Sequence, residues 1–372
     1  MIDYLKHVIS ESKTGQIPYD DYMNIVLYHP DFGYYMKQKE KIGKGGDFIT
    51  TSNISNVFGI LFADVFLKLF SKVELKPHLC EIGGGNGRFA KAILDQVHSK
   101  DPDLYDRLTY TLIESSPYHQ SLQQSILETH RGIEQFQSVE DMQKTYPEFN
   151  GIIFSNELYD AFPVSVIEKH NNELYEVMVA LDNEGKLVER YIPLSNKAIL
   201  TYLEEQNISL KEKQRFEVPL AMQEHIEKLG IWLNKGIVIT VDYGYTNEEW
   251  KLPEHSKGSL RGYYKHQLVE SALEHPGEMD LTTHIHFDSL VTAGEKSGLN
   301  YVTKLRQDRF LLAAGILDYL QEHHDTNPFS EKSKQNRALR SLIMEGSMSA
   351  AFHVVIQEKN ISIAWDEILT SW

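Results

Sequence analysis

Four glycines within five residues, at positions 83, 84, 85 and 87, constrain the fold of this chain more than any other stretch. The mostly apolar stretch from Leu79 to Ile82 before them predicts the end of a buried strand, and apolar residues recur at helical spacing from Arg88 to Val97. A strand, a glycine turn and a helix open a nucleotide-binding βαβ unit. Glycine suits such a turn because the backbone bends sharply and a Cβ atom would keep a ligand from the helix N-terminus.

The spacing of the glycines indicates which ligand the turn suits. A dinucleotide-binding turn has glycine at its first, third and sixth positions, but the sixth position here is Arg88. The order acid-x-Gly-x-Gly-x-Gly resembles instead the first motif of class I methyltransferases that use S-adenosylmethionine (SAM). The resemblance implies that Glu81 holds the ammonium group of SAM, directly or through water. It also implies that four residues make room for the cofactor: Gly83, Gly84, Gly85 and Gly87. A glycine turn without a ligand is the alternative.

A second acid supports an adenosine ligand. The stretch from Leu108 to Glu114 predicts the next strand, and it ends in the carboxylate of Glu114. An acid at this place accepts hydrogen bonds from both ribose hydroxyls, one on each carboxylate oxygen. Proteins that bind NAD use the same device, so Glu114 favours adenosine without distinguishing the two cofactors.

Composition limits the partners and the compartment. The chain has 372 residues, which predicts a core domain with a substantial elaboration. A net charge of −16 argues against nonspecific binding to nucleic acid. The single cysteine, Cys80, allows no disulfide within the chain and no cysteine-based zinc site. We see no signal peptide and no apolar run long enough to span a membrane, so we expect a cytoplasmic protein.

Four regions follow from the patterns along the chain. Residues 1–75 predict amphipathic helices around an aromatic and glycine-rich binding loop. Residues 76–170 predict the first half of a doubly wound, mostly parallel sheet, with strands near 78–82, 109–114 and 151–155 and helices near 88–98 and 117–129. Residues 171–235 predict an inserted cap, which begins with a hairpin. Residues 236–372 predict the second half of the core, with a long substrate-side loop at 246–287 and a late hairpin-like pair.

The third predicted strand points to a reactive centre. It ends in Asn156, Glu157 and, three residues later, Asp160. Ligands of open α/β sheets bind beyond the carboxyl ends of the strands, so these side chains are expected to face the reactive end of the cofactor. Asn156 is a candidate for contact with the cofactor itself.

Several motifs in one order extend the resemblance over most of the chain, from about Tyr19 to Ile356. They are Gly46-Asp47-Phe48-Ile49-Thr50, Phe58-Gly59, Glu81 to Gly87, Ser155-Asn156-Glu157, Asp160-Ala161 with Pro163, Asp242-Tyr243-Gly244, Leu260-Arg261-Gly262-Tyr263 with His266, and Pro276-Gly277 with Asp280-Leu281-Thr282. This series resembles the MidA family, the bacterial relatives of a mitochondrial complex I assembly-factor methyltransferase. The resemblance implies a class I, Rossmann-like methyltransferase fold with N-terminal and inserted elements over the cleft, SAM as cofactor, and transfer to a protein. The mitochondrial relative is an arginine methyltransferase that forms symmetric dimethylarginine.

The sequence departs from the family pattern at three positions. Asn53, Ile60 and His286 stand where the family usually has acids. The changes fall in segments expected to line the cleft. They leave the assignment of the cofactor unchanged and bear on which substrate the protein takes.

Methyl transfer to arginine would use paired acids, because a planar guanidinium takes bidentate carboxylate contacts. We therefore expect Glu157 to bind the guanidinium with Asp160 as its neighbour; the alternative is that Asp160 caps a turn and Glu157 orders the loop. Further candidates are His266 as a direct participant, Arg261, Tyr263 and Tyr34 for the substrate, and Gly46 and Thr50 for the cofactor. Arg261 and Tyr263 are also candidates for the carboxylate of SAM. His284 and His286, with Asp280 nearby, superficially suggest metal ligands, but we expect no metal because methyl transfer needs none.

Three hypotheses stay open at this point. The first is a SAM-dependent protein methyltransferase that acts on arginine, with a protein substrate as partner and a homodimer as one option. The second is a non-catalytic assembly factor that keeps the methyltransferase fold. The third, a nucleotide-dependent oxidoreductase, is disfavoured by Arg88.

Overall fold

A central sheet organises the molecule in the computed structural model, which describes residues 1–38, 56–321, 327, 330–344 and 351–370. Its strand order is β15-β16-β10-β5-β2-β3-β4, with the short β14 beside β10. Strands β4, β3, β2, β5 and β10 run parallel, and β16 is antiparallel to both of its neighbours. The bounds are β2 (His78–Ile82), β3 (Thr109–Ile113), β4 (Ile133–Phe136), β5 (Phe149–Asn156), β10 (Leu233–Tyr245), β14 (Ile285–His286), β15 (Asn300–Arg306) and β16 (Phe352–Lys359). This topology confirms the predicted class I, doubly wound α/β fold.

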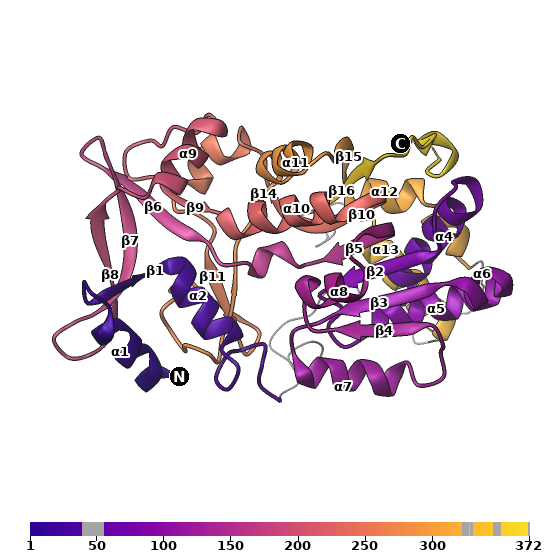
Figure 1. Ribbon diagram of the computed structural model, residues 1–372, viewed down its shortest axis with the longest axis horizontal. Coiled ribbons are helices and arrows are strands. Elements are labelled where there is room, and N and C mark those ends of the chain that lie inside the picture. Colours follow the sequence, from indigo (N-terminus) through magenta and orange to yellow (C-terminus); the bar gives the residue numbers. More distant parts are fainter. Residues whose placement is uncertain (39–55, 322–326, 328–329, 345–350, 371–372) are drawn as a thin grey trace.

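Helices cover both faces of this sheet because its inner strands are apolar on both sides (Figure 1). Leu79 and Phe154 pack on one face against α4 (Val57–Lys72), α5 (Arg88–Lys100), α12 (Gln307–Ala313) and α13 (Glu331–Ser341). Cys80 and Ile153 pack on the other against α8 (Val139–Thr145), α10 (Leu220–Trp232) and α11 (Phe287–Lys296). Two further helices, α6 (Pro102–Arg107) and α7 (Pro117–Ile126), lie between strands of the first half.

A second lobe lies at the other end of the elongated molecule (Figure 1). Its sheet has the order β1-β7-β6-β9, with β8 paired to β7. The lobe comprises α1 (Ile2–Glu11), β1 (Gln16–Pro18), α2 (Tyr19–Tyr28), β6 (Ser165–His170), β7 (Glu173–Leu181), β8 (Leu187–Pro193), α9 (Lys197–Glu205) and β9 (Arg215–Val218). Helices α1 and α2 therefore pack on the sheet of this lobe and share its core.

The predicted elements and the observed ones agree for most long, strongly periodic segments. Helices α1, α2 and α4 confirm the amphipathic helices predicted for residues 1–75, and β7 and β8 confirm the predicted hairpin. The second lobe does not coincide with the predicted insertion at 171–235, because β6 precedes that range and α10 packs on the central sheet. The sequence interpretation missed β4, α6 and α8, which are short and carry weak apolar patterns.

The expectation of a long loop at 246–287 was wrong in part. This range contains a three-stranded sheet of order β12-β11-β13, formed by β11 (Arg261–Tyr264), β12 (Gln267–Val269) and β13 (Asp280–Thr282), and two single-turn helices, η2 (Glu249–Lys251) and η3 (Pro253–His255). Strands of three or four residues are too short to give a periodic signal. Within the described ranges, no helix is long and apolar enough to cross a membrane.

Candidate active site

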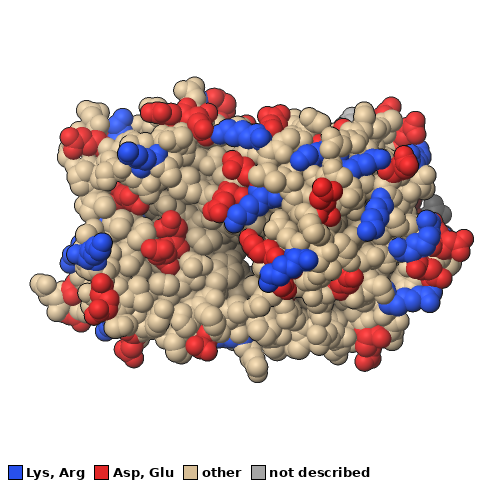
Figure 2. All heavy atoms as spheres, in the orientation of Figure 1, with Lys and Arg blue, Asp and Glu red and all other residues tan. Residues whose placement is uncertain are grey.

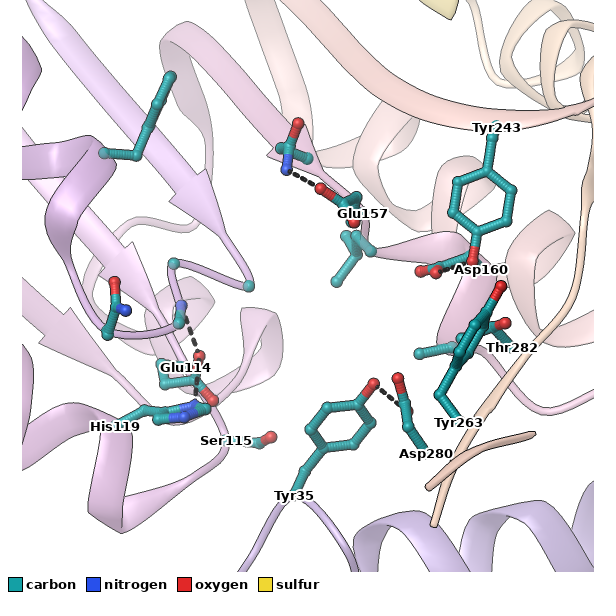
Figure 3. A pocket seen from close by; sticks show the side chains of 18 of the residues that line it. Tyr35, Glu114, Ser115, His119, Glu157, Asp160, Tyr243, Tyr263, Asp280 and Thr282 are labelled. Carbon is teal, nitrogen blue, oxygen red and sulfur yellow. Dashed lines mark hydrogen bonds and ion pairs between the residues drawn. The ribbon is translucent and has the colours of Figure 1, made fainter. Parts of the chain in front are cut away.

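A cavity of about 510 Å³ opens at the carboxyl ends of β2, β3, β5 and β10 (Figure 3). One part of its wall, which we call the glycine-loop side, comes from consecutive segments of the central sheet: Glu81, Gly83, Gly84, Gly85, Glu114 and His119. The opposite part, which we call the acidic side, comes from segments far apart in the sequence: Tyr35, Glu157, Asp160, Tyr243, Arg261, Tyr263, Asp280 and Thr282. The two sides face each other across the cavity in Figure 3.

The glycine turn is built from left-handed backbone. Gly83, Gly85 and Gly87 have φ angles of 77°, 50° and 79°, a region that residues with a side chain rarely adopt. A Cβ atom on Gly84 would lie 2.6 Å from the Leu112 side chain, so this glycine permits close packing on β3. Gly83, Gly84 and Gly85 line the cavity, whereas Gly87 is the N-cap of α5 and packs against α7.

Glu114 ties the turn to the end of β3. One carboxylate oxygen accepts the Gly85 N–H at 3.0 Å, and the other accepts the Ser116 N–H at 2.9 Å. The side chain of His119 lies 3.8 Å from the same carboxylate. Each carboxylate oxygen has a second lone pair, so Glu114 retains acceptor capacity toward the cavity that it lines.

Glu81 is a buried acid at the end of β2. Its carboxylate accepts the Tyr110 O–H at 2.7 Å. Burial raises the pKa of Glu81 to about 7, helped by the nearby Glu114 and opposed by the Tyr110 hydrogen bond. A cation placed beside Glu81 would favour its charged form, and an ammonium group is such a cation.

The end of β5 turns sharply toward the cavity. Glu157 has a φ of 50°, and its N–H donates to the Val241 carbonyl at 2.9 Å. A left-handed conformation is strained for a residue with a side chain, and such strain is found at ligand-binding positions. The Asn156 amide donates to Glu157 at 3.1 Å, while Oδ1 of Asn156 is buried and has no partner among the described residues.

Asp160 is buried and held from two directions. The Tyr243 O–H donates to its carboxylate at 2.5 Å, and its backbone carbonyl accepts the Thr283 N–H at 2.8 Å. Burial raises the pKa of Asp160 to about 6, against the Tyr243 hydrogen bond and the charge of Arg261. The fully buried Asp242 orders this loop, because its two oxygens accept the Tyr159 and Tyr243 N–H groups at 3.0 and 2.9 Å.

The small sheet presents one face to the cavity. Arg261 pairs with Thr282, and Tyr263 pairs with Asp280, in the antiparallel register of β11 and β13. Side chains directly opposite each other lie on the same face, so these four line the cavity together. The intervening Leu281 points to the other face and is buried in the core of the second lobe. Asp280 accepts the Tyr35 O–H at 2.6 Å, which joins this sheet to the N-terminal segment.

The remaining predicted site residues fall in different places. Tyr34 is buried in the core of the second lobe, and its neighbour Tyr35 lines the cavity instead. His266 is exposed at the β11–β12 turn, on the rim of the cavity. Gly46 and Thr50 lie outside the described residues. The sequence interpretation did not single out Tyr28, Tyr35 and His119 as site residues. The signal that could have identified Tyr35 was its place in the predicted aromatic binding loop.

The two histidines after β13 lie in different surroundings. His286 is buried and bonds the Tyr202 hydroxyl at 2.8 Å, and burial lowers its pKa to about 3. His284 lines the cavity and stacks on Tyr245 with ring centroids 4.6 Å apart. No group of three or more His, Cys, Asp or Glu in the described part of the chain is arranged to hold a metal ion.

This fold and site define a class I SAM-dependent methyltransferase. The glycine turn, the ribose-side acid and the strand order of the central sheet agree with it. A family model described as "Putative S-adenosyl-L-methionine-dependent methyltransferase" matches residues 58–304, and the chain belongs to this family, with the MidA-type methyltransferases.

Solved and curated relatives agree with this assignment. A structure of a likely methyl transferase from Burkholderia thailandensis, bound to S-adenosyl-homocysteine, superposes with a TM-score of 0.88 at 26% identity, over 98% of this chain and 93% of that chain. A protein from Danio rerio named "Protein arginine methyltransferase NDUFAF7, mitochondrial" is 27% identical over 94% of this chain and 85% of its own length. The protein of the same name from Xenopus laevis is 27% identical over 76% of this chain and 68% of its own length.

The cavity fits SAM, the cofactor of this class. Its volume of about 510 Å³ lies within the roughly 300–1,000 Å³ of small-molecule sites. Glu114 would hold the ribose, and Glu81 and the unpartnered Oδ1 of Asn156 would hold the ammonium group. When bound, SAM supplies a methyl group activated on a sulfonium.

Proposed function

We propose that this methyltransferase acts on the side chain of arginine in a protein. The observation that carries the proposal is the acidic side of the cavity, where Glu157, Asp160 and Asp280 line one wall beyond the end of β5. A guanidinium is planar, always charged and donates five N–H groups, so it suits a wall of several carboxylates. Figure 3 shows Asp160 and Asp280 with their tyrosine partners on the side of the cavity opposite Glu114.

Each acid has a distinct role in the proposal. Glu157, at the strained end of β5, binds and orients the guanidinium. Asp160 accepts the proton that the attacking nitrogen loses, since a pKa of about 6 lies near the working pH of a general base. Asp280, fixed by Tyr35, holds the far side of the guanidinium. The chain thus supplies alignment and charge, which is most of what an in-line methyl transfer requires.

Two further observations support the proposal. The relatives from Danio rerio and Xenopus laevis carry the name of protein arginine methyltransferases. The wall also contains the aromatic rings of Tyr28, Tyr35 and Tyr263, and a flat, delocalised cation is attracted to the face of such a ring. Over the face seen in Figure 2, basic and acidic side chains are interspersed, so this face carries no broad surface of a single charge.

A labelled-transfer assay tests the proposal. The protein is incubated with SAM carrying a labelled methyl group and a cell lysate, and the labelled protein is digested and sequenced by mass spectrometry. We expect the label on the nitrogen of arginine. Label on another residue would contradict the arginine assignment. Binding of SAM without any protein labelling would favour a non-catalytic assembly factor with the same fold.

A further inference from the structure

A buried acid of the second lobe holds the segment that leads into the acidic side. Glu217, in β9, is 1% exposed. One of its carboxylate oxygens accepts the Ser259 N–H at 2.9 Å and the Ser259 O–H at 3.1 Å, and the other accepts the Leu260 N–H at 3.3 Å. One carboxylate therefore satisfies three donors of the residues immediately before β11.

The backbone around this contact is shaped for it. The N–H of Arg215, also in β9, donates to the Ser256 carbonyl at 2.9 Å, which brings the segment alongside the strand. Gly258 has a φ of 73°, and a Cβ atom on it would lie 2.2 Å from a Glu217 carboxylate oxygen. A residue other than glycine would therefore be strained and would displace the carboxylate.

The contact continues into the cavity wall. The Ser259 hydroxyl, held by Glu217, accepts the His284 N–H at 2.9 Å. Arg261 begins β11 two residues after Ser259, and His284 follows β13. Both Arg261 and His284 line the cavity, and the Nε atom of Arg261 is buried without a partner among the described residues. Glu217 thus fixes the start of β11 and the segment after β13. These two strands carry the four side chains that we call the small-sheet face: Arg261, Tyr263, Asp280 and Thr282.

We infer that Glu217 is a positioning residue for methyl transfer, which sets the place of Arg261 and of the small-sheet face toward the acceptor. The inference rests on the proposed function, because it concerns the acceptor half of that site. Glu217 lies in the second lobe and acts through Ser259, so it positions the wall without touching the reacting atoms.

The variant Glu217→Gln tests the inference. An amide keeps one acceptor oxygen but turns its N–H₂ group toward the Leu260 or Ser259 N–H, so the segment loses its place. We expect the amount of lysate protein needed for half-maximal labelling to rise on the order of tenfold, with the affinity for SAM unchanged in calorimetry. Hydrogen exchange at the amides of 259–264 should accelerate, and exchange in α5 should not. Gly258→Ala, which keeps the charge, should have the same effects.

Glu189→Gln is the matched control. Glu189, also in the second lobe, binds Arg215 through both of its oxygens at 2.6 and 2.9 Å, away from the cavity. This variant should lower the melting temperature of the protein. The amount of lysate protein needed for half-maximal labelling should not change. A double variant of Glu217→Gln and Arg261→Lys should be about as impaired as the more impaired single variant.

Three results would overturn the inference. They are unchanged exchange at 259–264 in Glu217→Gln, additive effects of the two substitutions, or the same rise in half-saturation for Glu189→Gln. If the unaltered protein labels no lysate protein, the proposed function fails. Hydrogen exchange at 259–264 still decides whether Glu217 positions this part of the cavity wall.

Discussion

The two sides of the cavity are built in different ways. The glycine-loop side comes from one stretch of chain, between Glu81 and His119, and its turn is held by hydrogen bonds from backbone N–H groups to Glu114. The acidic side gathers residues from Tyr35 to Thr282, and tyrosine hydroxyls hold two of its carboxylates, those of Asp160 and Asp280. The first is a local structure of the fold, and the second is a product of how the second lobe and the small sheet pack.

This difference separates what is general from what is particular in the enzyme. A site made from backbone and one βαβ unit accompanies the class I fold, so it serves one cofactor with many acceptors. A site made from distant side chains changes when any one of its supporting segments changes. Substitutions on the two sides should therefore affect different measurements.

The largest effect should come from Glu157→Gln. The amide keeps the shape but removes the charge that is proposed to bind the guanidinium, so we expect labelled methyl transfer to fall about 10²–10³-fold. The affinity for SAM, measured by calorimetry, should change little. Glu176→Gln, a buried acid of β7, is the control and should transfer at the normal rate. Normal transfer by Glu157→Gln would remove this residue from the mechanism.

The reciprocal experiment is Glu114→Gln. One amide group cannot accept both the Gly85 and Ser116 N–H groups and the ribose hydroxyls, so the affinity for SAM should fall about thirtyfold, equivalent to about 2 kcal/mol. Glu134→Gln on β4, where the acid binds Tyr146, should leave the affinity unchanged. An unchanged affinity in Glu114→Gln would show that the cofactor is held elsewhere.

Asp242→Asn should have a smaller effect, on the acidic side alone. Burial and the neighbouring Asp160 raise the pKa of Asp242, while its two N–H donors oppose that rise. The side-chain oxygen of asparagine accepts one of these N–H groups, but its NH₂ group is a donor and faces the other N–H. The loop that carries Asp160 should therefore shift. We expect transfer to fall about tenfold with normal affinity for SAM. A loss of SAM affinity instead would mean that the two sides are not separable.

The smallest effect concerns pH. Because the pKa of Glu81 is raised to about 7 and a bound ammonium group favours the carboxylate, binding of SAM should release a proton near neutral pH. The affinity should therefore fall by up to about tenfold per pH unit as the pH drops below 7. Calorimetry between pH 6 and 8 measures this. The substitution Glu81→Gln should abolish this pH dependence of the SAM affinity, whereas Asp160→Asn should keep it. If the dependence survives in Glu81→Gln, the released proton comes from another group.

The same contrast explains how much could be predicted from the sequence. The glycine turn, β2 and β3 were predictable because their signals lie within one stretch: apolar runs, glycines needing positive φ, and an acid at a strand end. Family resemblance pointed to the Asp160 and Arg261 segments, and both line the cavity.

The supporting contacts of the acidic side were not predictable. Tyr35 rather than Tyr34 reaches the cavity, because the side chain of Tyr34 is buried in the core of the second lobe, and no local pattern separates these two adjacent tyrosines. Asp280 meets Tyr263 only through the register of two strands too short to be detected. The role of Glu217 depends on a contact across 42 residues that no local pattern encodes.

The central claim is that a cofactor side and a guanidinium-binding side share one cavity, and a pair of bisubstrate analogues tests it most directly. In one compound adenosine is linked to a guanidine, and in the other it is linked through the same chain to a primary amine. We predict that the guanidine compound binds at least about tenfold more tightly in calorimetry and that Glu157→Gln removes this preference. Equal binding of the two compounds would contradict the account.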